Sequence, residues 1–399
     1  MRIITRTIFI LSLVSLFADV ASEMIYPVLP LYLNEIGFKI FWIGVLEGFA
    51  GFTAGISKGY FGKLSDEKGV RLPFIRIGYF LSAISKPIIA LIAAPLWIFF
   101  SRAVDRLGKG VRTAARDALL SQQTSKENKG KVFGFHRSMD TLGAAIGPVI
   151  ALLFLVIYPG DYKTIFLLAF IPGIISVLLI FLLKEKKQPV STMGKGNFFS
   201  FLRYWKIATP EYKKLVTGLL LFALFNSSDF FLLIKTKEAI GDQIINIFGI
   251  NFYSETITIA AYIFYNLVFA LAAYPLGILA DRWGMKNIFM TGLVLFAGVY
   301  AGFAFSPSIF FIFILFFIYG IYAAATEGVA KAWITNTAHE SNTATAVGFY
   351  TSCESVCAFA ASTLAGTFWM LFGSTATFIS TAFIALLVLF YFSLKFKMK

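Results

Sequence analysis

Charged side chains inside long apolar stretches are the residues of this chain with the greatest chemical potential. A charge at the centre of a membrane helix costs at least about 2.5 kcal/mol on an insertion scale, so such residues usually pair, bind a ligand or carry a proton. Asp19 and Glu23 are spaced i,i+4, as are Glu327 and Lys331, so each pair lies on one helix face. We expect the following polar residues to mark a pathway for a substrate or a proton: Asp19, Glu23, Glu47, Arg102, Asp105, Asp140, Asn226, Asp229, Glu327, Lys331 and Glu354.

Three of these carboxyl groups, Asp19, Glu23 and Glu47, have no obvious cation nearby in the sequence. Burial favours the neutral form of a carboxyl group, so such a residue can take up and release a proton near neutral pH. They are the first candidates for a proton carrier. For three other pairs, an ion pair within one helix is an equally good interpretation: Glu327–Lys331, Arg102–Asp105 and Arg137–Asp140.

The elements that must position these side chains are membrane helices. The chain has 399 residues, of which 58% are hydrophobic and 14% charged, and its mean hydropathy is +0.79. A soluble domain would carry about a quarter charged residues. Apolar runs of roughly 20 residues, enough to cross a bilayer, recur along the whole chain. We therefore predict an all-α protein with about twelve transmembrane helices in two six-helix bundles.

The expected spans divide into two halves around a basic stretch at residues 185–213. We predict an N-terminal bundle at 1–184, a cytoplasmic linker at 185–213 and a C-terminal bundle at 214–399. The longest outward loop, 238–254, has room for a short interfacial helix. The expected spans are 7–33, 41–61, 73–93, 95–119, 131–157, 163–184, 214–236, 256–280, 287–305, 308–334, 344–371 and 374–395.

The net charge of +14 is concentrated in alternate loops. This asymmetry follows the positive-inside rule and predicts that both termini lie in the cytoplasm. The basic residues form no patch with interleaved stacking aromatics, so we expect no nucleic-acid partner. Arg2 and Arg6 precede an apolar run without a convincing cleavage site, which favours a first span over a signal peptide.

Residues for metal or cofactor chemistry are scarce. His136 and His339 are too few and too separated for a metal cluster, and Cys353 and Cys357 read as small hydrophobic residues of a helix. The sequence contains no G-x4-G-K-[ST], H-E-x-x-H or G-x-S-x-G motif. We therefore expect no metal, no cofactor and no enzyme activity. The expected partners are a small molecule, a proton and the lipid bilayer, and the expected state is a monomer.

One short phrase occurs in both halves. Residues 62–71 and 277–286 both fit G-x-L-[SA]-D-x-x-G-x-[KR], and each lies between two long apolar stretches. Glycines permit a tight turn and close helix approach. Further similarities between the halves include Gly134-Phe135 with Gly348-Phe349. Parallel repeats of this kind are a common layout of secondary transporters.

The repeated phrase resembles the signature loop of the major facilitator superfamily, and the resemblance covers the full length. Residues 134–148 resemble the fifth-helix motif of its drug:proton antiporter branch through Gly143, Gly147 and Pro148, although Ala151 and Leu152 replace the final glycines. Pro27 and Pro30 form a P-x-x-P that is similar to the same branch. Arg102 matches a motif arginine implicated there in proton transfer. Other phrases resemble a poorly characterised bacterial branch, which implies a multi-pass protein of the bacterial inner membrane.

The resemblance implies roles for several residues. The first, fourth, seventh and tenth spans would line the central cavity. Asp66 and Asp281 would accept hydrogen bonds from a neighbouring helix N-terminus, or from an arginine such as Arg112 or Arg116, and so hold the cytoplasmic side closed. A static topology anchor is the alternative. The fifth span would bend and pack closely against its neighbour at Gly143, Gly147 and Pro148. The alternative is that these small residues only allow ordinary helix packing. The expected gating residues are Gly62, Asp66, Arg71, Arg112, Gly277, Asp281 and Arg282.

Several functions remain compatible with these residues. A proton-coupled antiporter that exports a small organic molecule is favoured by the fifth-helix motif and the carboxyl groups without a local cation. A proton-coupled symporter that imports a metabolite or an iron chelate is favoured by Arg102, Lys109 and Lys331, which suit an anionic ligand. A transport-dead receptor or a channel fits less well, because both hinge phrases are intact and the two-fold repeat suits alternating access.

Overall fold

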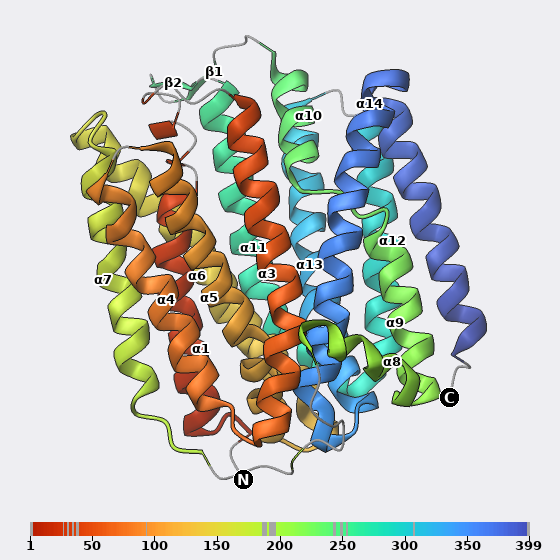
Figure 1. Ribbon diagram of the computed structural model, residues 1–399. Coiled ribbons are helices and arrows are strands. Elements are labelled where there is room, and N and C mark those ends of the chain that lie inside the picture. Colours follow the sequence, from red (N-terminus) through yellow and green to blue (C-terminus); the bar gives the residue numbers. More distant parts are fainter. Residues whose placement is uncertain are drawn as a thin grey trace.

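A computed structural model describes the chain from residue 3 to residue 396. Outside the described residues lie 27, 30–31, 34–35, 37–39, 93, 186–189, 191–196, 242–244, 248–249, 253 and 306–307. The backbone alone is described for residues 40–50, 52, 95, 245–247, 250–252 and 255. Within the described parts the protein is a bundle of long helices, and α1 begins and α14 ends at the same end of this bundle (Figure 1).

The N half, as we call the helices up to residue 184, contains six long helices within the described residues. They are α1 (Arg6–Ile25), α3 (Ile40–Lys68), α4 (Leu72–Leu91), α5 (Pro95–Gln122), α6 (Lys129–Ile157) and α7 (Tyr162–Ile180). The one-turn helix η1 (Lys126–Asn128) precedes α6. Helix starts follow local capping: the Thr5 hydroxyl accepts a hydrogen bond from the Ile8 amide at 3.3 Å, and Asp161 accepts one from Thr164 at 3.2 Å.

The C half, from residue 210 onward, repeats this arrangement with irregularities. Its long elements are α9 (Pro210–Ala223), α10 (Phe230–Ile240), α11 (Ser254–Trp283), α12 (Met285–Ala304), α13 (Ile309–Thr337) and α14 (Thr343–Lys395). Short elements are η2 (Phe198–Arg203), α8 (Tyr204–Ile207), η3 (Glu340–Asn342), and the strands β1 (Ile245–Ile247) and β2 (Ile250–Phe252). Helix α14 contains a kink at Gly373, where φ is 82°, and so supplies the last two crossings.

Within the described residues, eight helical stretches are each long and apolar enough to cross a membrane. The remaining crossings are helix α3, whose side chains are partly outside the description, the charge-rich α5, and the broken pair α9 and α10. The predicted all-α membrane architecture with two six-helix bundles is confirmed.

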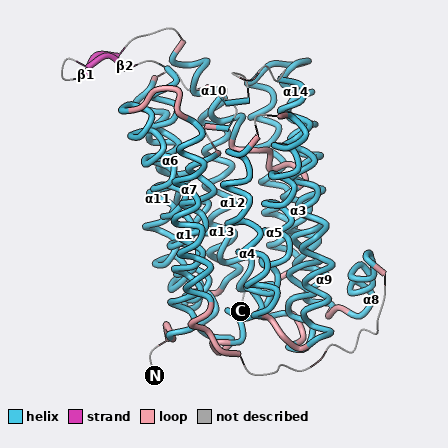
Figure 2. The backbone as a smooth tube through the Cα atoms, turned by 60° about the vertical axis from the view of Figure 1, so that its left-hand side comes forward, coloured by secondary structure: helices cyan, strands magenta, loops and turns pink. Residues whose placement is uncertain are grey.

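The structure corrects three local expectations. Helix α1 ends at Ile25 rather than at residue 33, just before Pro27, which has no amide hydrogen for a helix bond. The seventh span is interrupted between Ala223 and Phe230. The interruption carries short polar side chains that compete with helical hydrogen bonds: Asn226, Ser227, Ser228 and Asp229. The described part of the outer loop holds the antiparallel β1–β2 hairpin rather than a helix, at the end of the bundle opposite α8 (Figure 2).

The most extensive contacts between the halves are those of α3 with α14 and of α6 with α11. Equivalent glycines mark both contacts. A side chain at Gly134 would meet the Ala273 carbonyl and Gly277 of α11, and one at Gly348 would meet Lys58 and Gly59 of α3. The sequence repeat is therefore also a repeat of the interface.

The polar segment between the halves packs under the α3–α14 contact. The Phe201 ring lies where a side chain at Gly59 would stand, and Trp205 stacks on Phe349 with ring centroids 5.6 Å apart. These contacts join η2 and α8 to both halves.

Candidate functional site

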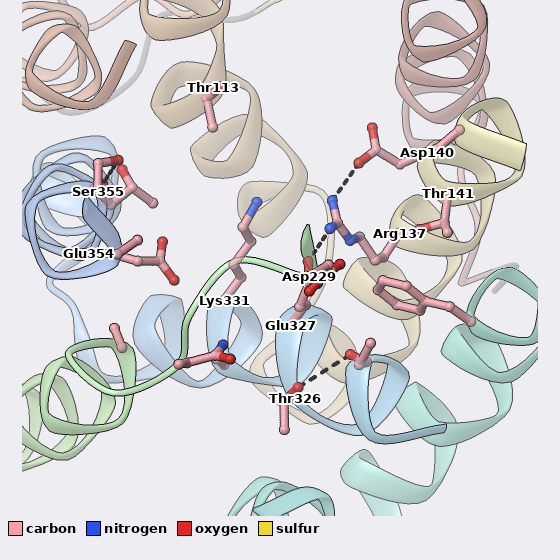
Figure 3. Close-up of a pocket in the computed structure, with 18 of the residues that line it drawn as sticks. Thr113, Arg137, Asp140, Thr141, Asp229, Thr326, Glu327, Lys331, Glu354 and Ser355 are labelled. Atoms are coloured by element: carbon pink, nitrogen blue, oxygen red, sulfur yellow. Dashed lines mark hydrogen bonds and ion pairs between the residues drawn. The ribbon is translucent and has the colours of Figure 1, made fainter. Parts of the chain in front are cut away.

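A central cavity of about 540 Å³ lies between the two halves. This volume is in the range of pockets that hold small organic ligands. Side chains from α1, α3, α5 and α6 form one wall. The other wall is formed by side chains from α9, α11, α12, α13 and α14 and from the break between α9 and α10 (Figure 3). Of the expected cavity residues, the described lining includes Asp19, Glu23, Asp140, Asn226, Asp229, Glu327, Lys331 and Glu354.

Arg137 bridges the halves across this cavity. Its guanidinium pairs with Asp140 on the same helix at 2.6 Å and with Glu327 of α13 through its second nitrogen (Figure 3). The Phe269 ring lies 5.2 Å from the guanidinium carbon. Arginine suits this position because its planar fork can serve two carboxylates at once.

A second ion pair links the same two helix groups. Lys331 of α13 contacts Asp117 of α5 at 3.0 Å, and Arg116 contacts the other oxygen of Asp117 at 3.0 Å. The ion pair within one helix, which is one of the two interpretations of Glu327 and Lys331, is therefore not formed. Each residue instead pairs across the interface, because the N half presents an opposite charge to both.

Two carboxyl groups meet at the contact between α1 and α6. Asp19 and Asp140 lie within hydrogen-bonding reach of each other. Asp140 also accepts a hydrogen bond from Ser15 of α1. Two like charges this close repel each other, which makes the pair a candidate site for binding a proton. Glu23 lines the cavity one helical turn farther along α1, while the side chain of Glu47, on α3, lies outside the described residues.

The glycines of the fifth-helix motif bring α6 against α1 at this level. A side chain at Gly143 would meet the Leu16 carbonyl and the Val20 amide, the latter at 3.1 Å. One at Gly147 would meet the Met24 amide and the Val20 carbonyl, both at 2.8 Å. Helix α6 continues through Pro148 to Ile157, and a functional bend there stays a prediction.

Gly147→Ala is expected to lower stability by about 1–3 kcal/mol, because the added methyl group overpacks the α1–α6 contact. The matched control is Gly298→Ala on α12, where no atom lies within 4 Å of the new carbon. Helix propensity alone should make the control neutral or more stable by up to about 1 kcal/mol. Thermal unfolding of the purified variants measures both, and equal unfolding temperatures would contradict the close packing.

The C-half wall combines carboxylates with tyrosine hydroxyls. Tyr319 donates to Asp229 at 2.6 Å and Tyr350 donates to Glu354 at 2.7 Å. Asn226 donates to the Tyr322 hydroxyl at 3.3 Å, while its own carbonyl oxygen is buried without a hydrogen-bond partner. Asn226 and Asp229 reach the cavity because the seventh span is unwound between α9 and α10.

Arg102 and Asp105 are not part of the described cavity lining, and this corrects their predicted place. Asp105 is buried between helices, where Lys86 of α4 contacts it at 2.7 Å and Arg102 at 3.6 Å. Lys86 also donates to Ser22 of α1 at 3.2 Å. The charged stripe of α5 winds around the helix, so this part of it faces α4.

The hinge carboxylate Asp66 contacts the beginning of α14 in the other half. It accepts hydrogen bonds from the Thr345 amide and hydroxyl, both at 2.6 Å, and from the Ala344 amide at 3.4 Å. Arg71 pairs with Asp66, and both side chains are fully buried. A carboxylate at this position also complements the positive end of the helix dipole.

Asp281 makes the equivalent contact in the opposite direction. It accepts hydrogen bonds from the Gly130 and Lys131 amides at 2.7 and 2.8 Å, at the start of α6. The hinge glycines adopt left-handed backbone, with φ of 62° at Gly69 and 91° at Gly284. Gly62 and Gly277 allow the close approach, since a side chain at either would meet backbone of the other half. We call these two contacts the hinge latches.

Two expected gating residues are absent from the latches. Arg112 donates to Ser82 and lies 4.2 Å from the centre of the Tyr79 ring, so it faces α4 and the cavity rather than Asp66. Arg71 takes its place because the tight turn directs its side chain back to α3. Arg282 is exposed and makes no hydrogen bond or ion pair with any described residue.

Lys58, Lys86 and Asp117 are further charges within the expected spans whose positions emerge only from the structure. Lys58 lines the cavity from α3, Lys86 holds Asp105, and Asp117 anchors Lys331. The available signal was the same one that identified the other candidates, namely a charge inside an apolar stretch.

Comparison with known proteins agrees with this architecture. A family model described as Major Facilitator Superfamily matches residues 11–252 and 239–398. An uncharacterised MFS-type transporter, MJ1317 of Methanocaldococcus jannaschii, is 31% identical over 95% of this chain and 94% of that protein. The multidrug resistance protein MdtG of Citrobacter koseri is 25% identical over 69% of this chain and 66% of its own length. The multi-drug resistance efflux pump PmrA of Streptococcus pneumoniae is 30% identical over 35% of each chain.

Solved structures support the same fold. FucP in an outward conformation superposes with a TM-score of 0.78 over 100% of both chains, at 13% identity. The human organic anion transporter MFSD10 gives a TM-score of 0.75 over 97% of this chain and 99% of its own, at 16% identity. The chain belongs to the Major Facilitator Superfamily, and it is a membrane transporter rather than an enzyme.

Proposed function

We propose that this transporter exports a small organic molecule in exchange for protons. The observation that carries the proposal is the connection of two neighbouring carboxyl groups, Asp19 and Asp140, through Arg137 to Glu327 of the other half. The relatives named as multidrug efflux pumps support the direction of transport.

The chain of charges suggests how a proton controls the interface. While the Asp19–Asp140 pair holds a proton, it carries one negative charge, and Arg137 can serve Asp140 and Glu327 together. Loss of this proton adds a second negative charge beside Arg137 and draws the guanidinium toward the N half. The bond to Glu327 weakens, and the two halves become free to rotate about the α3–α14 and α6–α11 contacts.

The hinge latches give the direction of opening in this proposal. Both lie at the same end of the bundle as the segment that joins the halves (Figure 1). By the positive-inside rule that end is cytoplasmic, as are both termini. The structure then corresponds to a state closed toward the cytoplasm, with bundles 1–184 and 214–399 moving about the linker 185–213. We place the protein in the bacterial inner membrane, acting as a monomer.

Asp19→Asn is expected to abolish proton coupling while leaving the fold intact, because the amide keeps the size of the carboxyl group but cannot share a titrating proton. A thermal-shift screen at two pH values identifies a substrate, and a pH dye trapped in proteoliposomes then reports protons moved by a substrate gradient. The variant should give at least about a tenfold smaller proton signal.

The control for this experiment is Glu238→Gln. Glu238 is a carboxylate at the outer end of α10 that pairs only loosely with Lys235, at 3.6 Å. The Glu238→Gln variant should give the same proton signal as the unmodified protein. A normal proton signal in Asp19→Asn would remove the carboxyl pair from the mechanism.

A proton-coupled symporter is the second candidate. The described lining contains Lys58 and Lys109, which suit an anionic group on the cargo, and protonation of nearby carboxyl groups would strengthen anion binding. The same assay distinguishes the candidates: in antiport the protons move against the substrate, and in symport they move with it.

A further inference from the structure

The two walls of the cavity carry opposite charge. Among the described lining residues, the N half contributes five cations and three carboxyl groups, and the C half contributes one cation and three carboxylates. The N-half set is Lys58, Lys109, Arg112, Arg116, Arg137, Asp19, Glu23 and Asp140. The C-half set is Lys331, Asp229, Glu327 and Glu354. The cavity as a whole is balanced, but it is strongly dipolar across the interface.

The positive charge available to a ligand lies on α3 and α5. Arg116, Arg137 and Lys331 are already paired with carboxylates. The ammonium groups of Lys58 and Lys109 make no hydrogen bond or ion pair with any described residue, and Lys109 is exposed to the cavity. Glu23 and Asp19 lie near Lys109, but the five cations of this wall outnumber its three carboxyl groups, so positive charge remains in excess.

The acceptors available to a ligand lie at the break in the seventh span. Asp229 accepts a hydrogen bond from Tyr319 through one carboxylate oxygen, and the Tyr265 hydroxyl also lies near this carboxylate. Among the described residues, the buried carbonyl oxygen of Asn226 has no hydrogen-bond partner, and the backbone carbonyls of residues 224–227 accept no hydrogen bond from any described backbone amide. Unwound helix segments with free carbonyls bind cationic groups in other transporters.

Aromatic rings surround the same acceptors. Tyr265 lies 5.1 Å from Tyr319, which lies 5.1 Å from Tyr322, and Tyr262 lies 5.9 Å from Tyr265, between ring centroids. The faces of such rings attract cations. This wall therefore offers an ammonium group a carboxylate, free carbonyl oxygens and aromatic faces.

We propose that the cavity binds a dipolar small molecule, whose anionic group contacts Lys58 and Lys109 and whose ammonium group contacts Asp229. This inference rests on the proposed transport function and names the class of cargo. A purely cationic ligand would face the positive N-half wall, and a purely anionic ligand would face three carboxylates of the C half. A dipolar ligand satisfies both walls and contacts both halves at once, as a cargo must if its binding is to influence their relative position.

The dipeptide phenylalanyl-alanine and its blocked forms test the proposal. N-acetylation removes the ammonium charge, C-amidation removes the carboxylate charge, and the doubly blocked peptide carries neither. Binding to the purified full-length protein is measured by calorimetry and thermal shift at neutral pH, without any gradient. The free dipeptide should bind at least about tenfold more tightly than either singly blocked form, since each block removes a charge-assisted contact.

Two variants assign the ends of the ligand. Asp229→Asn should make the free and N-acetylated peptides bind alike, and Lys109→Met should make the free and amidated peptides bind alike. Lys235→Met, at the outer end of α10 and outside the described lining, should leave the order unchanged. The proposal would be overturned by any of three results. A singly blocked peptide could bind most tightly, the order of peptide affinities could stay unchanged in both cavity variants, or none of the four peptides could bind.

These outcomes are separable from those of the transport function. Proton-coupled export of a cargo with a single charge would leave the function standing and refute the dipolar cargo. Selective binding of the free dipeptide without any proton-coupled movement would support the dipolar site and refute the antiport.

Discussion

Arg137→Met is expected to eliminate proton-coupled transport and to lower stability more than any other single substitution in the cavity. Its removal leaves Asp140 buried without its closest cation and leaves Glu327 without an ion-pair partner among the described residues. Breaking a fully buried pair costs about 3–5 kcal/mol. Because the Glu327 side chain is 42% exposed, the loss here should be nearer 2–3 kcal/mol.

Two further variants separate the bridge from the packing around it. Arg137→Lys keeps the charge but cannot serve two carboxylates with one planar group, so stability should largely recover while coupling stays weak. Glu327→Gln leaves Arg137 paired with Asp140, so the protein should fold normally and lose the link between proton release and rotation. Proton-coupled flux in proteoliposomes and unfolding temperature measure the two effects. Normal coupling in Glu327→Gln would show that the bridge is structural only.

Asp66→Asn is expected to open the cytoplasmic side. Its amide group would place hydrogens opposite donors at the start of α14, and Arg71 would lose its partner. Charge-assisted hydrogen bonds contribute about 1.5–3 kcal/mol each. The opening equilibrium should therefore shift by about ten- to a hundredfold, since 1.4 kcal/mol corresponds to a factor of ten.

Asp281→Asn should produce a smaller shift in the same direction, about threefold to tenfold. Asp281 is only partly buried, accepts two backbone hydrogen bonds and has no ion-pair partner within the described residues. Glu67→Gln is the matched control, because Glu67 is next to Asp66 but pairs with Lys63 of its own helix. Spin labels at the exposed positions 127 and 340, one in each half, report the separation. If the distribution of distances between the two labels is unchanged in Asp66→Asn, the contact of Asp66 is only a static topology anchor and does not control opening.

The sequence predicted the architecture and the hinges because both depend on local signals. Apolar length identifies membrane helices, and a glycine that needs left-handed backbone beside an aspartate identifies a turn with a free carboxylate, as at Gly69 and Gly284. The preference of a carboxylate for a helix N-terminus is general, so this kind of partner could be anticipated for Asp66 and Asp281. The sequence could not show which helix would supply this N-terminus.

Ion-pair partners were less predictable, because they depend on how helices face one another. Glu327 and Lys331 have the spacing of an intrahelical pair, yet both find closer partners across the interface. Arg102 and Asp105 do pair within α5, but Lys86 of α4 turns them away from the cavity. The break before Asp229 was hidden for a different reason, since it contains neither proline nor glycine.

The two hinge latches differ in their accessibility to dissolved ions. Mobile salt screens exposed charges far more than buried ones. Asp66 and Arg71 are fully enclosed, whereas Asp281 is partly exposed to solvent. Rising cytoplasmic ionic strength should thus loosen the α6–α11 side of the interface before the α3–α14 side. The two equivalent contacts of this fold would thus respond differently to salt, and the osmotic state of the cell would influence which of them opens first.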